Sequence, residues 1–337
     1  MHFVRLLVLI ICFASSLAAG DRIVVAADGS GEFKTVQDAL ATVTDNSADP
    51  TVIHIKPGTY QGQIILPNTK SKVTFEGEDA QKTILTFALN TNEPNPPEVE
   101  QRFKGTGVVI LGDDFQAEKI TFQNTSGDHG QALALRIDGD RAVLKDCRLL
   151  GWQDTLMINN GRQYFKDCYI EGRVDFIYGS ATAVFDHCEI HSKNGGHVTA
   201  ASTPEDHPYG FVFLSCKLTG DAIPWSPPTG SPPPRVTPLA DLGRPWRPYA
   251  SVTYINCEMG SHIKPQGWNN WGKAENEKTA RYSEFGSTGP GADPEKRVGW
   301  SKQLTKEEAE KITIDSVLGG DDGWKPQSAV ATTRDGT

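Results

Sequence analysis

Apolar and polar positions in the middle of the chain repeat in a fixed order. The repeated phrase is an apolar residue (a threonine in the last copy), three further residues, a cysteine, one residue and a second apolar residue. It occurs five times, around Cys147, Cys168, Cys188, Cys216 and Cys257. A diverged copy has Ile120 in place of the cysteine, and residues 71–75 resemble another, so the cysteines serve first as small hydrophobic residues. Such repetition is typical of a solenoid.

The distance between copies indicates the size of one coil. From Ile120 onward, successive copies are 27, 21, 20, 28 and 41 residues apart, so one bare coil takes about 20 residues. Segments 141–144, 163–165 and 182–185 alternate apolar and polar positions between Gly and Asp turns. Because a period of two is that of a β-strand, we expect an all-β protein, a parallel β-helix with short strands.

The longer spacings and the chain ends predict what surrounds the coils. Long spacings indicate loops inserted at a turn, and the Pro-rich stretch 224–234 is the clearest of them. We expect such loops to wall a groove. Terminal coils need caps, and the sequence predicts helical caps over 35–43 and from Thr305 onward. Everything after Asp321 is expected to be peripheral, with 326–337 as a tail.

The first 20 residues have the pattern of a secretory signal peptide. Arg5 precedes the apolar run 6–13, and small residues occupy 18–20. A membrane anchor or a buried strand is the alternative, but the apolar run is shorter than a membrane span. We therefore expect an exported chain without a membrane segment in its mature form, folded as one domain over 21–325. Before Ile23 there is no room for an inhibitor-like pro-domain, so activity on secretion is expected.

Charge and composition exclude several kinds of partner and site. The chain has 33 basic and 42 acidic residues, a formal net charge of -9, which disfavours nucleic acid. An acidic glycan would have to be partly neutral or be bound through a local basic strip. The eight histidines are scattered and there is no CxxC or HExxH motif, so no metal is expected. Loss of Cys12 leaves five cysteines, an odd number.

Two carboxylates are expected to be neighbours in the solenoid. Asp154 and Asp175 are 21 residues apart, and each lies seven residues after its repeat cysteine. Residues one coil apart are separated by roughly 4.8 Å. Repulsion then raises the pKa of one acid, so that one carboxyl stays protonated while the other is an ionised nucleophile. An Asp ladder that caps turns is the structural alternative.

Polar neighbours favour the catalytic interpretation of this pair. Gln153 precedes Asp154, and Gln131 lies 22 residues earlier, about one coil away. Two amide donors aimed at one point can bind an oxyanion. Arg244 supplies a fixed cation that could keep one carboxylate ionised, although an ordinary surface salt bridge would look the same in the sequence.

The chain resembles the pectin methylesterase family from Ile23 to Gly319. The matching segments are 23–31, 58–60, 122–125, 131–136, 151–156, 172–179, 242–246 and 267–271. The resemblance implies a right-handed parallel β-helix, no metal or organic cofactor, and methyl-esterified homogalacturonan as the substrate. It also implies hydrolysis of the methyl esters to methanol and de-esterified pectin.

The resemblance assigns a role to each candidate residue. Asp175 would attack the ester carbonyl, while Asp154 would protonate departing methanol and then activate water. Gln131 and Gln153 would hold the oxyanion, and Arg244 would hydrogen-bond Asp175. Residues expected to contact the sugar are Trp246, Trp271, Phe176 and Tyr178, with Phe176 equally explained as a core residue.

Four positions depart from the family pattern, namely Gln63, Trp152, Arg173 and Tyr178. The added charge of Arg173 is expected to favour sugars that are already demethylated.

The sequence also suggests two kinds of covalent modification, disulfide bonds and N-glycosylation. The resemblance supports a disulfide between Cys168 and Cys188, and Cys216 with Cys257 is a weaker candidate. Asn124 begins a glycosylation sequon but lies within a family motif, so a structural role explains it equally well.

Two other functions fit part of the pattern. Two carboxylates about 5 Å apart would also suit a retaining glycosidase, but the paired glutamines argue against it. A solenoid that only binds cell-wall glycan is disfavoured by the complete Gln, Gln, Asp, Asp, Arg set. We expect a monomer, as is usual for a capped solenoid.

Overall fold

The computed structural model describes residues 21–94, 96–222 and 239–331. The expected signal peptide and the Pro-rich stretch 224–234 lie outside the described residues, as does the end of the expected tail.

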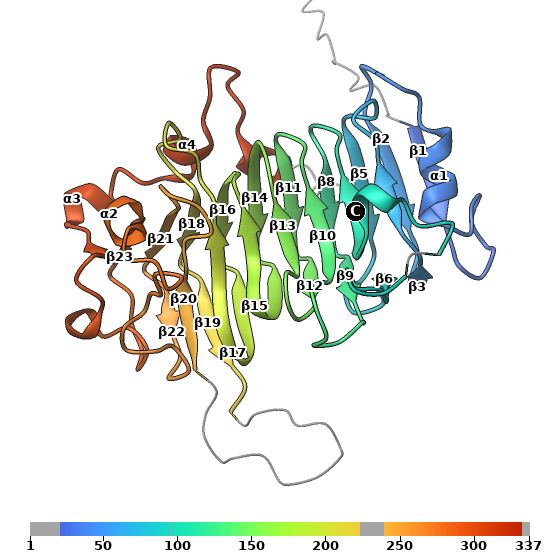
Figure 1. The fold of residues 1–337 in the computed structure, drawn as a ribbon. Coiled ribbons are helices and arrows are strands. Elements are labelled where there is room, and N and C mark those ends of the chain that lie inside the picture. The colour runs from blue at the N-terminus through green and yellow to red at the C-terminus, as the bar shows by residue number, and fades with distance from the viewer. Residues whose placement is uncertain (1–20, 95, 223–238, 332–337) are drawn as a thin grey trace, which may run out of the picture.

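The chain folds as a right-handed parallel β-helix, which confirms the predicted class (Figure 1). Over the described residues, short strands form an eleven-stranded and a thirteen-stranded sheet. The first sheet contains β1 (Asp21–Val25), β2 (Thr51–Ile55), β5 (Val73–Gly77), β8 (Gln116–Glu118), β11 (Ala142–Lys145), β14 (Arg162–Lys166), β16 (Thr182–Asp186), β18 (Phe211–Leu214), β21 (Ser251–Ile255), β23 (Arg281–Phe285) and β24 (Lys302–Gln303). The second contains β3 (Gly58–Gln61), β4 (Ile64–Leu66), β6 (Thr83–Phe87), β7 (Thr106–Ile110), β9 (Thr121–Asn124), β10 (Leu133–Ile137), β12 (Arg148–Leu150), β13 (Leu156–Ile158), β15 (Tyr169–Gly179), β17 (Glu189–Ala201), β19 (Lys217–Gly220), β20 (Ala240–Gly243) and β22 (Glu258–Met259).

The second sheet has two faces because β15 and β17 are long enough to bend between them. One face continues through β4, β7, β10, β13, the C-terminal halves of β15 and β17, and β20. This face, called the site face below, carries the candidate residues.

Short helices lie at the ends and in the loops. The N-terminal cap is α1 (Val36–Thr42), which Thr35 caps by accepting from the Asp38 amide at 3.1 Å. At the other end, α3 (Lys306–Ala309) begins with the expected Thr cap and ends sooner than expected. The remaining elements are α2 (Asn276–Thr279), α4 (Ile314–Leu318), α5 (Pro326–Ala331) and the 3₁₀ turns η1 (Gln101–Phe103) and η2 (Pro294–Lys296).

A backbone corner explains the repeated phrase. The residue before every repeat cysteine has a left-handed conformation, for example Asp146 with φ 51° and Asn256 with φ 54°. Asp and Asn adopt this conformation more readily than most residues because their short polar side chains hydrogen-bond locally. The corner turns the chain from one sheet into the next and directs the following cysteine into the core, where all five are buried.

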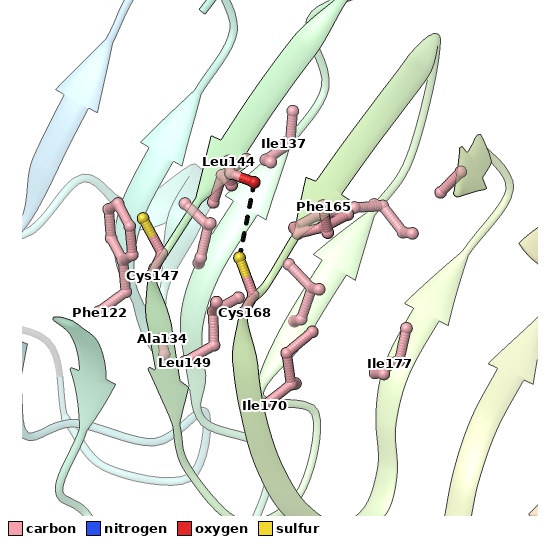
Figure 2. Packing of buried hydrophobic residues seen from close by; sticks show 14 of the residues in the cluster. Phe122, Ala134, Ile137, Leu144, Cys147, Leu149, Phe165, Cys168, Ile170 and Ile177 are labelled. Carbon is pink, nitrogen blue, oxygen red and sulfur yellow. Dashed lines mark hydrogen bonds between the residues drawn. The ribbon is translucent and has the colours of Figure 1, made fainter. Parts of the chain in front are cut away.

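The core consists of side-chain stacks that run from coil to coil (Figure 2). One stack contains Phe165, Phe185, Phe213 and Tyr254, with successive ring centroids 4.7, 4.5 and 4.4 Å apart. Identical positions of adjacent coils therefore pack against each other, which is the physical reason that the sequence repeats.

Phe185→Ala is expected to lower the free energy of unfolding by about 3 to 5 kcal/mol, because it opens a cavity in the middle of the stack. Urea unfolding measures this effect. Phe185→Leu, which refills most of the space, should cost clearly less. Equal losses in the two variants would contradict the cavity explanation.

The expected disulfides are wrong for this structure, in which Cys168, Cys188, Cys216 and Cys257 are all free thiols. The Cys168 thiol donates to the carbonyl oxygens of Leu144 and Lys166 at 3.5 and 3.4 Å, the first of which Figure 2 marks. Cys188 donates in the same way to Phe165 at 3.5 Å. The buried cysteines are thus free thiols that contact backbone carbonyls.

The C-terminal segment packs along the outside of the coils. Asp322 accepts hydrogen bonds from Arg162 at 2.7 and 3.0 Å, and the Arg162 guanidinium lies 5.3 Å from the Trp324 ring. Val317 and Leu318 of α4 cover apolar side chains on the outer face of the eleven-stranded sheet. Asp322 and Trp324 thus contact the coils at the surface through Arg162.

Asn124 has a structural role in this fold. It is 4% exposed, and its amide nitrogen donates to the carbonyls of Leu89, Leu133 and Gly105 at 3.0, 3.2 and 3.3 Å. No helix in the described part of the chain is both long and apolar enough to cross a membrane.

Candidate active site

Asp154 and Asp175 lie next to each other on the site face, one coil apart as the spacing predicts. The Asp154 amide donates to the carbonyl of Val174 at 3.0 Å, and Leu156 is in register with Ile177 just beyond the two acids. Both aspartates have left-handed backbones, with φ 66° and 52°. Such conformations cost energy for residues other than glycine and cluster at functional sites.

Close packing beneath the acids fixes their position. A Cβ added to Gly172 would lie 2.2 Å from the Cβ of Phe176 and 2.8 Å from the Thr155 hydroxyl oxygen. Only glycine leaves room for this contact between β15 and the turn that follows Asp154. The glycine of the Gly-Arg-Val-Asp motif thus allows the two coils to stack closely enough for their carboxylates to meet.

Arg244 holds Asp175 through two parallel hydrogen bonds. Its Nε and Nη2 donate to Oδ1 and Oδ2 of Asp175 at 2.8 and 2.7 Å. The arginine follows β20, and its amide donates to the carbonyl of Thr199 at 2.9 Å. A bidentate pair of this kind is stronger and more strictly oriented than a single hydrogen bond. Arg244 therefore keeps the Asp175 carboxylate oriented.

The environment of Asp154 favours its protonated form. Burial, and next the charge of Asp175, raise the pKa of Asp154 from 3.8 to about 7, against the opposing effects of Arg244 and the two glutamine amides. Asp154 is 5% exposed. Near neutral pH the pair therefore combines a proton donor with a carboxylate that is paired to arginine.

Gln131 and Gln153 approach the same point from adjacent coils. They form an isolated parallel bridge, and the Ala132 amide donates to the Gln153 carbonyl at 3.1 Å. Both side-chain amides interact with the Asp154 carboxyl and lower its pKa. Amide donors converging beside a carboxylate pair can stabilise negative charge that develops on a substrate oxygen.

A cleft of about 230 Å³ opens beside these groups. It is lined by Gln131 and Asp154 and by the aromatic residues Tyr178 and Trp246. The two rings meet edge to face, with centroids 5.7 Å apart. Two of the four expected sugar contacts are therefore at the mouth of the site, where partly exposed rings can pack against a sugar.

The other two expected aromatic contacts are placed differently. Phe176 is fully buried, so its prediction as a substrate contact is wrong: it follows the left-handed Asp175 and points back into the core. Trp271 lies on the Arg244 guanidinium, whose central carbon is 3.7 Å from the ring centroid. Sequence reasoning missed this role, which no local motif signals.

Arg173 is not a free cation. Its guanidinium forms an ion pair with Asp128, from the loop after β9. The charge expected to attract demethylated sugars is thus already matched by a carboxylate.

A basic group at one end of the cleft was also missed. Arg102, Phe103, Lys104 and Arg136 line the same cleft as Asp154. The first three belong to η1 and the residue after it, in a loop that follows no repeat, so the coil spacing could not place them.

Comparisons with known proteins agree with this geometry. The family model described as Pectinesterase matches residues 22–321. Pectinesterase 31 of Arabidopsis thaliana is 41% identical over 293 residues, which cover 85% of this chain and 88% of that protein. The pectin methylesterase from carrot superposes with a TM-score of 0.82 at 30% identity, covering 96% of this chain and 98% of that one. A pectin methylesterase in complex with a hexasaccharide gives a TM-score of 0.74 at 28% identity, covering 92% and 99%.

Proposed function

Because the chain belongs to the pectinesterase family, we propose that the cleft at Asp154 and Asp175 hydrolyses methyl esters of homogalacturonan and releases methanol. The chain is a carboxylic ester hydrolase that acts on pectin. The observation that supports this site above all is the carboxylate pair, in which Arg244 holds Asp175 while the pKa of Asp154 is raised to about 7.

The first half of the proposed reaction forms a covalent intermediate. An oxygen of Asp175 attacks the ester carbonyl carbon, and the carbonyl oxygen becomes an oxyanion that accepts hydrogen bonds from the Gln131 and Gln153 amides. When the tetrahedral species collapses, the bond to the methoxy oxygen breaks and Asp154 gives that oxygen its proton. Methanol leaves, and an acyl anhydride joins the galacturonate to Asp175.

The second half restores the enzyme. Asp154, now ionised, takes a proton from water, whose oxygen attacks the acyl carbon of the galacturonate. The anhydride bond breaks, the sugar leaves as a carboxylic acid, and Asp175 is again a carboxylate. One ester and one water give one acid and one methanol, with no cofactor.

We also propose that the protein is exported and acts as a monomer. Export is supported by the signal-peptide pattern of residues 1–20. The partial methylation of pectin suits a protein with a formal net charge of -9, because neutral esters reduce repulsion.

The proposal is tested by incubating purified protein with highly methylated pectin. Methanol should appear without new reducing ends and without unsaturated uronides. Reducing ends without methanol would instead support the glycosidase alternative, and the absence of all three products would favour a glycan-binding module or a different ester as the substrate.

Trp271→Leu is expected to lower kcat by about 3- to 30-fold, because a cation–π contact to a partly buried guanidinium contributes roughly 0.5 to 2 kcal/mol. Arg244 would then hold Asp175 less rigidly. Steady-state kinetics distinguish this role from a simple sugar contact, which would raise KM and leave kcat alone. Trp271→Phe keeps an aromatic face and should restore most of kcat.

A further inference from the structure

A lysine on β17 reaches back to the turn that directly precedes Gln153. The Lys193 ammonium donates to the carbonyl of Gly151 at 3.2 Å and lies 3.9 Å from the centroid of the Trp152 ring. It also donates to the carboxylate of Glu171 at 3.0 Å. Glu171 belongs to the coil between, so Lys193 spans a whole coil to touch the two residues before Gln153.

The surroundings of the Lys193 ammonium fix its position. The side chains of Lys193 and Glu171 are only 18% and 19% exposed. The second carboxylate oxygen of Glu171 accepts from the Tyr169 hydroxyl at 3.0 Å, which orients this partner as well. A partly buried ammonium that is held by a carbonyl, a carboxylate and an aromatic face is more strictly oriented than a lysine in water.

Backbone contacts join the same turn to the neighbouring coils. The Trp152 carbonyl accepts from the Arg173 amide at 2.8 Å, and the Gln153 carbonyl accepts from the Ala132 amide at 3.1 Å. The Thr155 hydroxyl donates to a backbone carbonyl of β15 at 2.9 Å. The chain on both sides of Gln153 is thus held, and Lys193 adds a side-chain clamp on the residues before it.

The clamp is anchored on the side of the solenoid away from the cleft. Glu171 lies in the first half of β15, in register with Leu150 of β12, and this part of the second sheet is not the site face. Lys193 therefore acts on the reaction through Gln153, whose side-chain amide interacts with the Asp154 carboxyl.

We propose that Lys193 and Trp152 form a cation–π clamp that positions the Gln153 amide for the oxyanion of the proposed ester hydrolysis. An oxyanion donor must lie about 2.7 to 3.1 Å from the developing charge, so a small displacement of its backbone weakens it. Trp152 is one of the four departures from the family pattern, and tryptophan is the aromatic residue that binds a cation most strongly. This inference rests on the proposed function, because the oxyanion forms only when an ester carbonyl is attacked.

The test is steady-state methanol release from highly methylated pectin by the wild type, Lys193→Met and Trp152→Leu. Both variants should lower kcat by about 5- to 50-fold and leave KM nearly unchanged. This loss is smaller than the roughly 100-fold or more that removal of an oxyanion donor causes, because Gln153 itself remains. Trp152→Phe keeps an aromatic face that binds the cation less strongly, so its kcat should lie between those of the wild type and Trp152→Leu.

Two controls address folding. Lys166→Met removes a similarly buried lysine, which pairs with Asp167 and Asp186 on the eleven-stranded sheet, and should leave kcat unchanged. If Trp152→Leu does not fold, Trp152→Phe supplies the comparison, since it keeps a ring at this position.

The pH profile separates positioning from a general loss of structure. Hydrogen bonding by the Gln153 amide lowers the pKa of Asp154. If Trp152→Leu loosens Gln153, the pKa of Asp154 rises, and the alkaline decline of kcat/KM should move to higher pH than in the wild type. This variant removes no charged group, so the shift cannot come from a lost charge. An alkaline decline that stays in place would contradict the loosening of Gln153.

Two kinetic results would overturn the clamp. The first is an unchanged kcat in both Lys193→Met and Trp152→Leu, even if their free energies of unfolding fall, because the contact would then serve the fold alone. The second is a raised KM at unchanged kcat, which would make Trp152 a sugar contact. A wild type that releases no methanol would instead refute the proposed function, so the two failures are distinguished.

Discussion

Asp175→Asn is expected to abolish pectin de-esterification, with kcat lowered by about four orders of magnitude or more. The amide has nearly the shape of the carboxylate but cannot attack the ester carbonyl. Removal of a covalent nucleophile leaves only the contribution of the oxyanion donors and of substrate binding. Methanol release by purified variant and wild type, measured at saturating pectin, gives the comparison.

Controls must separate chemistry from folding, because Asp175→Asn leaves Arg244 without its anionic partner. Asp186→Asn offers a matched case: it alters a buried carboxylate on the eleven-stranded sheet, where Asp186 accepts from Tyr164 at 2.6 Å. Asp186→Asn is expected to keep kcat, while Asp175→Asn should lose it and still bind pectin. An Asp175→Asn enzyme that keeps more than about a tenth of kcat would exclude Asp175 as the nucleophile.

The coil spacing is sufficient to place the acids and the oxyanion candidates. In a stacked solenoid, the difference in residue number between equivalent positions becomes a distance, so Asp154, Asp175 and the two glutamines can be placed from the repeat alone. The left-handed corner before each repeat cysteine occurs at the same place in every coil, so residue numbers can be compared from one coil to the next. Where the coils are regular, arithmetic on the sequence therefore predicts the site.

The remaining features depend on orientation and on loops, which spacing does not encode. The prediction of Phe176 as a sugar contact is wrong because the left-handed backbone at Asp175 reverses the expected alternation and buries the ring. Trp271 reaches Arg244 from an insertion beyond the repeat. The basic turn at Arg102 also lies outside the coils.

The expected disulfide is wrong because the stacked cysteines remain free thiols that contact backbone carbonyls.

Asp154→Asn is expected to lower kcat by about two to four orders of magnitude, because methoxide is a strongly basic leaving group that needs a proton. In the wild type, kcat/KM should fall as the pH rises through about 7, where the free enzyme loses the Asp154 proton. The pH profile of the residual activity in Asp154→Asn should lack this limb. A wild-type profile with no decline on the alkaline side would argue against Asp154 as the proton donor.

The same substitution should make the protein more stable at alkaline pH. Burial and the charge of Asp175 raise the folded pKa of Asp154 to about 7, while the unfolded side chain ionises near 3.8. Between these values the folded state binds a proton that the unfolded chain has lost, so the stability of the wild type falls as the pH rises through this window. At roughly 1.4 kcal/mol per pKa unit, the ionised Asp154 costs the fold a few kcal/mol above pH 7.

Urea unfolding of Asp154→Asn and wild type should therefore give similar free energies near pH 4 and a clear advantage for the variant near pH 8. Asp186→Asn should behave in the opposite way. Although burial opposes the shift, hydrogen bonds from Tyr164 and His187 lower the pKa of Asp186, so its carboxylate stabilises the fold above the unfolded pKa and that stability is lost on acidification. A stability difference between Asp154→Asn and wild type that does not change with pH would mean that Asp154 is not held protonated. If the difference does grow with pH, ionised Asp154 lowers the free energy of unfolding of the wild type. A residue that destabilises the fold in this way is expected where catalysis requires it.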